Sequence, residues 1–250
     1  MSDIQNLRVF FLTVGEPGAI NTLDDFIKRT KQPYKLTVWY DACGRGVDLH
    51  FWGEMLARTK DVIVSAENRG TVGAVAYAML YTDFDYLMLL LADTVVEEGY
   101  LDRMKTALAR FGKVACAGST RNQFNVKVDY DFVLNARELE PDGIMLFSKE
   151  AINEIGGIAT AFKGMGQEQR EWNERAMEKG WNIVSCNNIM TEKGTMHDGR
   201  IHNPRLAEEI AESEKTYLKI YDRRWKDLNW WDNKIEKEEQ KQCQPIASIF

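Results

Sequence analysis

A single carboxylate ends the most apolar stretch of the chain. Residues 86–92 read Tyr-Leu-Met-Leu-Leu-Leu-Ala, and Asp93 follows them directly. Uninterrupted apolar runs of this length are typical of strands that are buried on both faces, as in a parallel sheet. Open α/β sheets bind ligands at the carboxyl ends of such strands, and a buried carboxylate needs a cation or a donor beside it. We therefore expect Asp93 to hold a metal-bound diphosphate. The alternative is that Asp93 caps a helix beginning near Glu97.

Polar residues also follow the three strands that are predicted before this one, at residues 7–14, 36–41 and 62–65. Because the carboxyl ends of parallel strands share one edge of a sheet, these residues should gather beside Asp93. They are Thr13, Glu16, Asp41, Asn68, Arg69 and Gly70. An Asn-Arg-Gly turn that leads into a helix suits contact with phosphate or a nucleobase. Taken alone, such a triplet is more often an ordinary turn.

A second group of chemically useful side chains lies in the predicted helix that follows Gly166. Glu168, then Glu171 or Trp172, then Arg175 share one face at helical spacing. An acid, an aromatic ring and a guanidinium could supply a general base and position a substrate. The alternative is structural, since acids favour the first turn of a helix and Glu171 can pair with Arg175 one turn later.

Two further parts of the chain could complete a site. Residues 119–140 mix polar and aromatic types without a sustained period, which is more often a binding loop than filler. Phe124 and Tyr130 in this loop, together with Trp172, could stack on an acceptor. His197 is one of three histidines in the chain. Since imidazole is a common metal ligand, His197 could share a cation with Asp93, although an ordinary surface histidine is the alternative.

Strands and helices alternate along most of the chain, which predicts βαβ units and a mostly parallel twisted sheet flanked by helices. We assign residues 1–203 to this α/β domain. Residues 204–250 are highly charged and helical in pattern, and Tyr217 and Tyr221 begin an apolar stripe. We expect this C-terminal helical extension to pack on the domain, with a homo-oligomer contact as an alternative role.

Composition and sequence motifs argue against several classes of protein. The net charge of −6 disfavours a protein that wraps nucleic acid. Four cysteines without CxxC spacing argue against a zinc site or a disulfide framework. Neither GxGxxG nor GxxxxGK[ST] occurs, so the two common phosphate-loop motifs are absent. Without a secretory-type N-terminus or an apolar run long enough to span a bilayer, we expect a cytoplasmic protein with no transmembrane segment.

The ordered set of motifs resembles the GT-A fold nucleotide-sugar glycosyltransferases of the family 2 type. The loop 13–16 and Asp41 resemble the strand ends that bind the nucleoside. Residues 67–74, Glu-Asn-Arg-Gly-Thr-Val-Gly-Ala, are similar to the NxGxxxA turn and helix under the nucleotide. Residues 90–96 resemble the strand with a DxD-type metal motif, and residues 166–175 resemble the helix G-E-D-x-D-x-x-x-R. The resemblance covers roughly residues 7–200.

The resemblance implies transfer of a sugar from a nucleotide-diphosphate donor to an acceptor hydroxyl. A UDP-sugar is the first candidate for the donor. It implies donor binding by the strand-end residues and a Mn²⁺ or Mg²⁺ ion at Asp93 and His197. The acceptor would be a glycan, a lipid-linked sugar or, less expected from the charge, nucleic acid. Two departures stand out. Leu91 occupies the place of the first metal-binding Asp, and Gln169 the place of the usual base.

With Gln169 in that place, Glu168 and Glu171 remain as candidates for the base. We favour Glu168 because it stands at the start of the helix, nearer the expected cleft. If neither acid acts as base, a retaining reaction becomes plausible. Two other functions stay open. A sugar nucleotidyltransferase would need a basic Gly-rich loop after the first strand, which residues 15–18 (Gly-Glu-Pro-Gly) lack. A non-catalytic nucleotide- or glycan-binding domain would explain Leu91 and Gln169.

Overall fold

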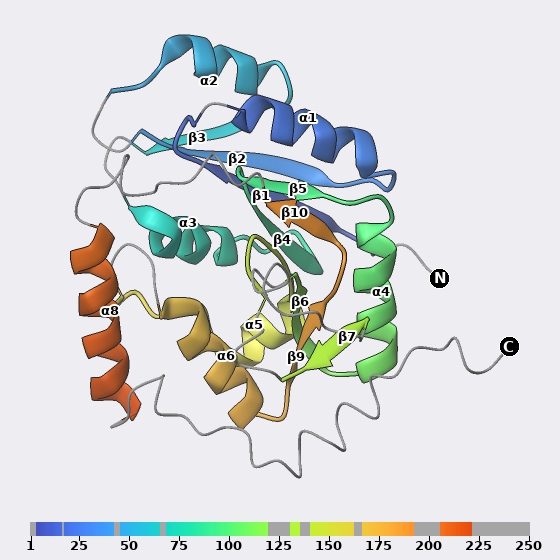
Figure 1. Ribbon diagram of the computed structural model, residues 1–250, viewed down its shortest axis with the longest axis vertical. Helices are drawn as coiled ribbons and strands as arrows, with labels where there is room; N and C mark the ends of the chain where they lie inside the picture. Colours follow the sequence, from blue (N-terminus) through green and yellow to red (C-terminus); the bar gives the residue numbers. More distant parts are fainter. Residues whose placement is uncertain are drawn as a thin grey trace, which may run out of the picture.

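The computed structural model describes residues 4–16, 18–42, 46–65, 69–119, 131–135, 141–162, 167–192 and 206–221. Over these ranges the chain forms one large twisted sheet with helices against both faces (Figure 1). The eight strands lie in the order β3-β2-β1-β4-β8-β6-β9-β7. Six of them run in one direction, and β8 and β7 run against them. The predicted α/β class with a mostly parallel sheet is therefore confirmed.

The first four strands of the sheet follow the predicted boundaries closely. They are β1 (Leu7–Thr13), β2 (Lys35–Asp41), β3 (Asp61–Ser65) and β4 (Tyr86–Leu91), and all four are parallel. The other half of the sheet is formed by β6 (Val114–Gly118), β7 (Phe132–Leu134), β8 (Ile144–Ser148) and β9 (Asn182–Cys186). A separate two-stranded ribbon pairs β5 (Thr94–Val96) with β10 (Met190–Glu192) in antiparallel fashion. The sequence pattern also predicts strands at residues 113–118, 142–148 and 180–186, which correspond to β6, β8 and β9, but it does not predict β7 or β10.

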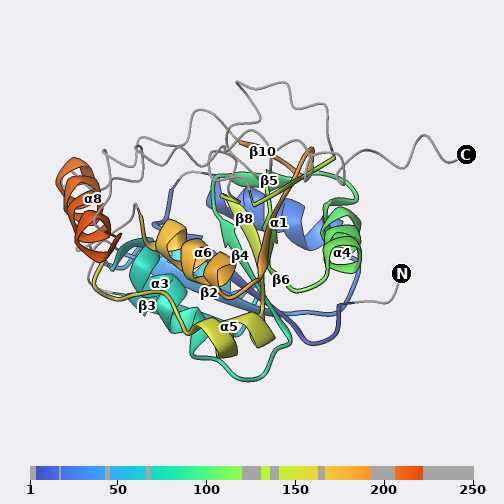
Figure 2. The same cartoon turned by 90° about the horizontal axis from the view of Figure 1, so that it is seen from below.

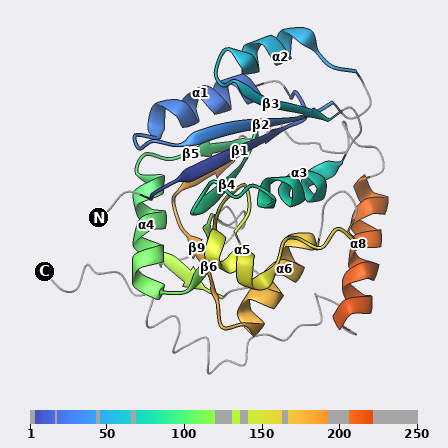
Figure 3. The ribbon, with the colours of Figure 1, turned by 180° about the vertical axis from the view of Figure 1, so that it is seen from behind.

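Alternate residues of the central strands divide between two cores, which places the helices on opposite faces (Figures 1 and 3). Val9 and Phe11 of β1 pack with α1 (Ala19–Arg29), α2 (Leu49–Leu56) and α4 (Tyr100–Phe111). Phe10 and Leu12 belong to the core under α3 (Gly70–Met79), α5 (Lys149–Ile155) and α6 (Glu168–Glu178). Successive side chains of a strand point to opposite faces, so a strand that is buried on both faces packs against one layer of helices on each side of the sheet.

The long apolar run is divided by a turn. After β4 ends at Leu91, the chain turns at Ala92 and Asp93 and continues as β5, which leaves the large sheet. The next helix, α4, begins only at Tyr100, with Gly99 as its N-cap residue. Asp93 therefore does not cap that helix, and the alternative interpretation of this residue is wrong.

Beyond the sheet domain, the structure describes one helix of the predicted C-terminal extension, α8 (Leu206–Tyr221) (Figure 2). Tyr217 on this helix is 1% exposed and joins the core that contains α3 and α6. Tyr221 packs against the same core and stacks on Tyr217, with the ring centroids 4.7 Å apart. In the part of the chain that the structure describes, no helix is both long enough and apolar enough to cross a membrane.

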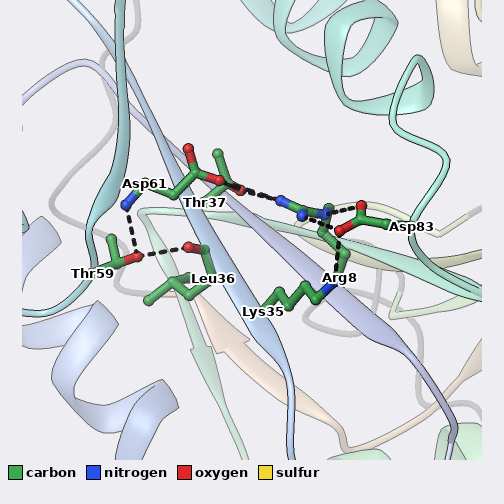
Figure 4. Close-up of polar contacts among 7 residues, drawn as sticks. All are labelled: Arg8, Lys35, Leu36, Thr37, Thr59, Asp61 and Asp83. Atoms are coloured by element: carbon green, nitrogen blue, oxygen red, sulfur yellow. Dashed lines mark hydrogen bonds and ion pairs between the residues drawn. The ribbon is translucent and has the colours of Figure 1, made fainter.

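A buried guanidinium ties together the starts of the parallel strands (Figure 4). Arg8 is 6% exposed and lies near the start of β1. It donates two hydrogen bonds to Asp83, of 3.0 and 2.8 Å, and one of 2.8 Å to Thr37 Oγ1. It also reaches Asp61 Oδ2 at 3.3 Å. Lys35 Nζ adds a bond of 2.6 Å to Asp83. This cluster lies at the amino ends of the strands and leaves the carboxyl ends for the site described below.

We predict that Arg8→Met lowers the free energy of unfolding by about 2 kcal/mol, because it removes charged hydrogen bonds from a buried position. This loss of stability is smaller than for breaking a fully buried ion pair. The side chains of Asp61 and Asp83 are 44% and 42% exposed, so water can replace the lost hydrogen bonds. Lys35→Met is the matched control, with a smaller expected effect, because Lys35 is 60% exposed. Urea denaturation of the three proteins measures both values.

The same variants test a dependence on pH. Hydrogen bonds from Arg8, and then from Lys35, hold the pKa of Asp83 well below its ordinary value of 3.8. A carboxyl with a lowered pKa stabilises the folded state above its unfolded pKa and loses this contribution as the pH falls. The wild type should therefore lose stability below about pH 4, and Arg8→Met should lose less over that range. Parallel pH curves for the two proteins would contradict this assignment.

Candidate functional site

The loop after β1 is shaped by its own two polar side chains. Thr13 Oγ1 donates to Glu16 Oε2 at 2.5 Å, and the Val14 amide donates to the same oxygen at 2.9 Å. The Gly15 amide donates to Thr13 Oγ1 at 2.9 Å. Thr13 and Glu16 are both 4% exposed. Thr13 and Glu16 thus bond to each other, and one oxygen of Glu16 holds the loop in place.

The end of β2 is joined to the start of α3 by a carboxylate. Asp41 is 4% exposed, and its Oδ2 accepts the backbone amides of Arg69, at 2.9 Å, and Gly70, at 3.3 Å. Gly70 has φ +58°, a left-handed value that glycine adopts without steric cost. The Arg69 side chain is exposed. The structure therefore brings Asp41, Arg69 and Gly70 together at the carboxyl edge, as the sequence predicts.

Asp93 lies at the same edge, in the turn after β4. It is 3% exposed, and Thr94 Oγ1 donates to its Oδ1 at 3.3 Å. The adjacent Ala92 amide donates to the Leu12 carbonyl of β1 at 3.0 Å, which keeps this turn beside the loop 13–16. The ends of β1, β2 and β4 lie along one edge of the sheet (Figure 1). Thr13, Asp41 and Asp93 therefore lie at this carboxyl edge.

The helix α6 begins on the side of the sheet where α3 begins (Figures 1 and 3). Its first residue is Glu168, which is 5% exposed. Glu171, one turn later, forms two short bonds with Arg175, Nε–Oε1 at 2.6 Å and Nη2–Oε2 at 2.9 Å. Arg175 also donates to the carbonyls of Ile155 at 2.8 Å and Gly157 at 2.9 Å. The Glu171–Arg175 pair thus fastens α6 to the end of α5, as in the structural alternative.

Trp172 cannot stack on an acceptor, and this part of the sequence prediction is wrong. Its side chain is fully buried and packs edge-to-face on Phe147, with the ring centroids 5.1 Å apart. Its indole nitrogen donates to the Gly156 carbonyl at 2.8 Å. The ring therefore belongs to the core between α6 and the sheet. An i, i+3, i+4 pattern marks a helix face but does not distinguish a core face from a cleft face.

Four other predicted site residues, namely Asn68, Phe124, Tyr130 and His197, lie outside the described residues. Their roles stay predictions. In the ranges that the structure describes, no group of three or more His, Cys, Asp or Glu side chains could hold a metal ion. Asp93 is thus the one predicted metal ligand within these ranges. A divalent cation there would take its remaining ligands from phosphate oxygens, water or residues outside these ranges.

Sequence reasoning missed a short segment beside the site. Residues 141–143, Pro-Asp-Gly, lie between α6 and the turn that contains Asp93. The Gln169 side-chain amide donates to the Pro141 carbonyl, and the Leu91 amide donates to the Gly143 carbonyl at 2.9 Å. A Pro-Asp-Gly sequence before a strand is a turn signal. That signal predicts the turn but not what the turn contacts.

The fold was compared with solved structures. It is similar to the mannosyltransferase PcManGT from Pyrobaculum calidifontis in complex with GDP-Man and Mn²⁺, with a TM-score of 0.59 and 18% identity. The alignment covers 86% of this chain and 64% of that chain. It is also similar to GalNAc-T7 with UDP, GalNAc and Mn²⁺, with a TM-score of 0.66 and 12% identity, over 98% of this chain and 56% of that one.

Comparison with models of protein families gave no match. Comparison with curated proteins gave none either. The chain spans less than two thirds of the length of each of the two structures named above. At such low identity the likeness concerns the path of the backbone and the order of its elements. The chain has the GT-A fold of nucleotide-sugar glycosyltransferases.

Proposed function

We propose that this protein transfers a sugar from a nucleoside-diphosphate sugar, with a UDP-sugar as the first candidate, to an acceptor hydroxyl. The observation that carries the proposal is the buried Asp93 after β4, at the same edge of the sheet as the end of the adjacent β1 and of β2 next to it. A carboxylate in this position suits a cation-bound diphosphate, because ligands of open α/β sheets bind at the carboxyl edge.

The nucleoside would lie across the ends of β1 and β2. Asp41 holds the amides of Arg69 and Gly70, and so fixes the turn into α3 that the resemblance assigns to the nucleotide. The exposed Arg69 side chain is proposed to contact the diphosphate. At the end of β1, the loop 13–16 is held by the bond from Thr13 to Glu16 and by the bond from the Gly15 amide to Thr13. The predicted Asn68 would join this donor set.

A divalent cation, Mn²⁺ or Mg²⁺, fits this site if the donor supplies most of its ligands. Asp93 offers a hard oxygen ligand at the right edge of the sheet, and both ions accept phosphate oxygens and waters as ligands. His197 is proposed as a second protein ligand. When bound, such an ion would stabilise the negative charge on the departing diphosphate. Both structural relatives named above were solved with Mn²⁺.

Glu168 is proposed as the general base that takes the proton of the acceptor hydroxyl. It stands at the first residue of α6, whereas Glu171 is committed to Arg175 by two hydrogen bonds. An inverting displacement requires such a base on the acceptor side. The acceptor class stays open between a glycan and a lipid-linked sugar, with Phe124 and Tyr130 as proposed contacts.

Isothermal titration calorimetry with UDP, GDP and their sugar derivatives, with and without Mn²⁺, tests the proposal. We expect one diphosphate nucleotide to bind with a dissociation constant below about 1 mM and to bind more tightly with Mn²⁺. Absence of binding by every nucleotide at that concentration would remove the proposed function. Binding without release of diphosphate from any sugar donor would favour the non-catalytic nucleotide-binding domain.

A further inference from the structure

Residues 141–143, called the 141–143 bridge below, connect the two halves of the proposed site. At one end, the Gln169 side-chain amide donates to the Pro141 carbonyl. Gln169 is the second residue of α6 and directly follows Glu168. The middle of the bridge is fixed to the sheet, since the Asp142 amide donates to the Ser119 carbonyl at 2.5 Å. The first turn of α6 is thereby attached to a segment that is itself held by the sheet.

At its other end, the bridge contacts residues on both sides of Asp93. The Leu91 amide donates to the Gly143 carbonyl at 2.9 Å. A Cβ atom on Gly143 would lie 2.8 Å from Thr94 Oγ1, so the backbone here touches the hydroxyl that bonds Asp93. Gly143 also has φ +76°, which disfavours any side chain. The bridge thus packs directly against the turn that holds the carboxylate.

We propose that Gln169 is a positioning residue that, through the 141–143 bridge, fixes Glu168 relative to Asp93. The proposal rests on the proposed function, because it gives these two carboxylates their roles. It also explains why a glutamine stands where the resemblance expects an acidic base. The Pro141 carbonyl is an acceptor, so the side chain at position 169 must donate. An ionised Asp or Glu has only acceptor oxygens and would face the carbonyl without a hydrogen bond.

The first test removes the hydrogen-bond donor of the side chain at position 169 and keeps the size of that side chain. Gln169→Glu exchanges the amide for a carboxylate, and Gln169→Met is of similar volume without charge. We expect each to lower kcat for donor turnover, measured as release of nucleoside diphosphate, by at least about tenfold, since misplacement of a reacting group by a small distance costs this much or more. The KM for the sugar donor should change less than about twofold, because the proposed donor-binding residues lie at the ends of β1, β2 and β4 and do not include Gln169.

Gln167→Glu is the matched control. It adds the same charge at the same end of α6, one residue before the helix begins. The Gln167 Oε1 accepts from Arg170 at 3.2 Å, so a glutamate there gains a cationic partner. This control should keep kcat and KM within about twofold of the wild type. Equal losses of kcat in Gln167→Glu and Gln169→Glu would show that charge, not the bond to Pro141, is responsible, and would overturn the proposal.

Gln169→Asp distinguishes two explanations of the glutamine: that it positions Glu168, or that it replaces a general base that has been lost. If position 169 had once carried the general base, restoring an acid there should raise turnover. The positioning role instead predicts that turnover falls as it does in Gln169→Glu.

Hydrogen exchange supplies a readout that needs no turnover. In Gln169→Met the amides of Leu91 and of residues 168–171 should exchange faster than in the wild type, and in Gln167→Glu they should not. Unchanged exchange in Gln169→Met overturns the proposal.

The failure of this inference differs from failure of the proposed function. If the wild type binds no diphosphate nucleotide, the assignment of the site fails, whatever the variants do. If the wild type binds and turns over donor and the Gln169 variants match it, the site stands and the positioning role fails. Thermal unfolding of each variant identifies loss of the fold, and Gln169→Met carries the test if the charged variants do not fold.

Discussion

Replacing Asp93 by alanine should abolish the Mn²⁺-dependent part of nucleotide binding. Asp93 is the one predicted metal ligand among the described residues, and it is 3% exposed at the carboxyl edge of the sheet. Without its carboxylate, a cation would keep only phosphate, water and any ligand outside these ranges. The affinity of the variant for UDP in the presence of Mn²⁺ should therefore fall to that of the wild type treated with a chelator. Titration calorimetry with and without the cation measures both values.

Asp85→Ala is the control, because Asp85 precedes the first residue of the same strand, β4, at its opposite end. Its carboxylate accepts from Asn6 at 2.8 Å and is remote from the carboxyl edge. This control should leave nucleotide binding and its dependence on Mn²⁺ unchanged. Asp93→Asn tests whether charge or shape matters, since it keeps the size of the side chain and one oxygen. Unchanged Mn²⁺-dependent affinity in Asp93→Ala would exclude Asp93 as a ligand.

The sequence was most informative where burial determines residue type. The apolar runs of β1, β2 and β4 predicted strands buried on both faces, and their parallel order predicted that Thr13, Asp41 and Asp93 share one edge. The turn that splits residues 86–96 into β4 and β5 was not predicted. Both strands are apolar, and an apolar run carries no signal for a change of sheet.

The helix α6 shows where a pattern leaves two interpretations. Its spacing grouped Glu168, then Glu171 or Trp172, then Arg175 on one face as a possible base and positioning set. The structure instead uses Glu171, Trp172 and Arg175 to fasten α6 to the end of α5. Helical spacing says which residues share a face, and it does not say what lies opposite. The contact between Gln169 and Pro141 joins residues 28 positions apart in the chain, and a single sequence does not reveal such a pairing. Only the structure reveals long-range polar contacts of this kind.

Replacing Glu168 by glutamine should keep donor binding and lower turnover by a factor of about 10²–10⁴, the usual contribution of a general base. The amide has nearly the same shape as the carboxylate, so the first turn of α6 should stay in place, yet it cannot accept a proton from the acceptor hydroxyl. Donor affinity is measured by calorimetry, and turnover by release of nucleoside diphosphate. Glu171→Gln is the matched control on the same helix.

Glu171→Gln should mainly affect stability, whereas Glu168→Gln should mainly affect turnover. Glu171 is 4% exposed and makes two bonds to Arg175, which in turn holds the end of α5. The change should therefore lower the free energy of unfolding by about 1–2 kcal/mol, while turnover by the folded protein falls much less than in Glu168→Gln. If Glu171→Gln instead loses turnover and keeps its stability, the roles of the two acids are reversed. Measuring both stability and turnover on the two variants therefore separates the proposed base, Glu168, from the structural carboxylate, Glu171.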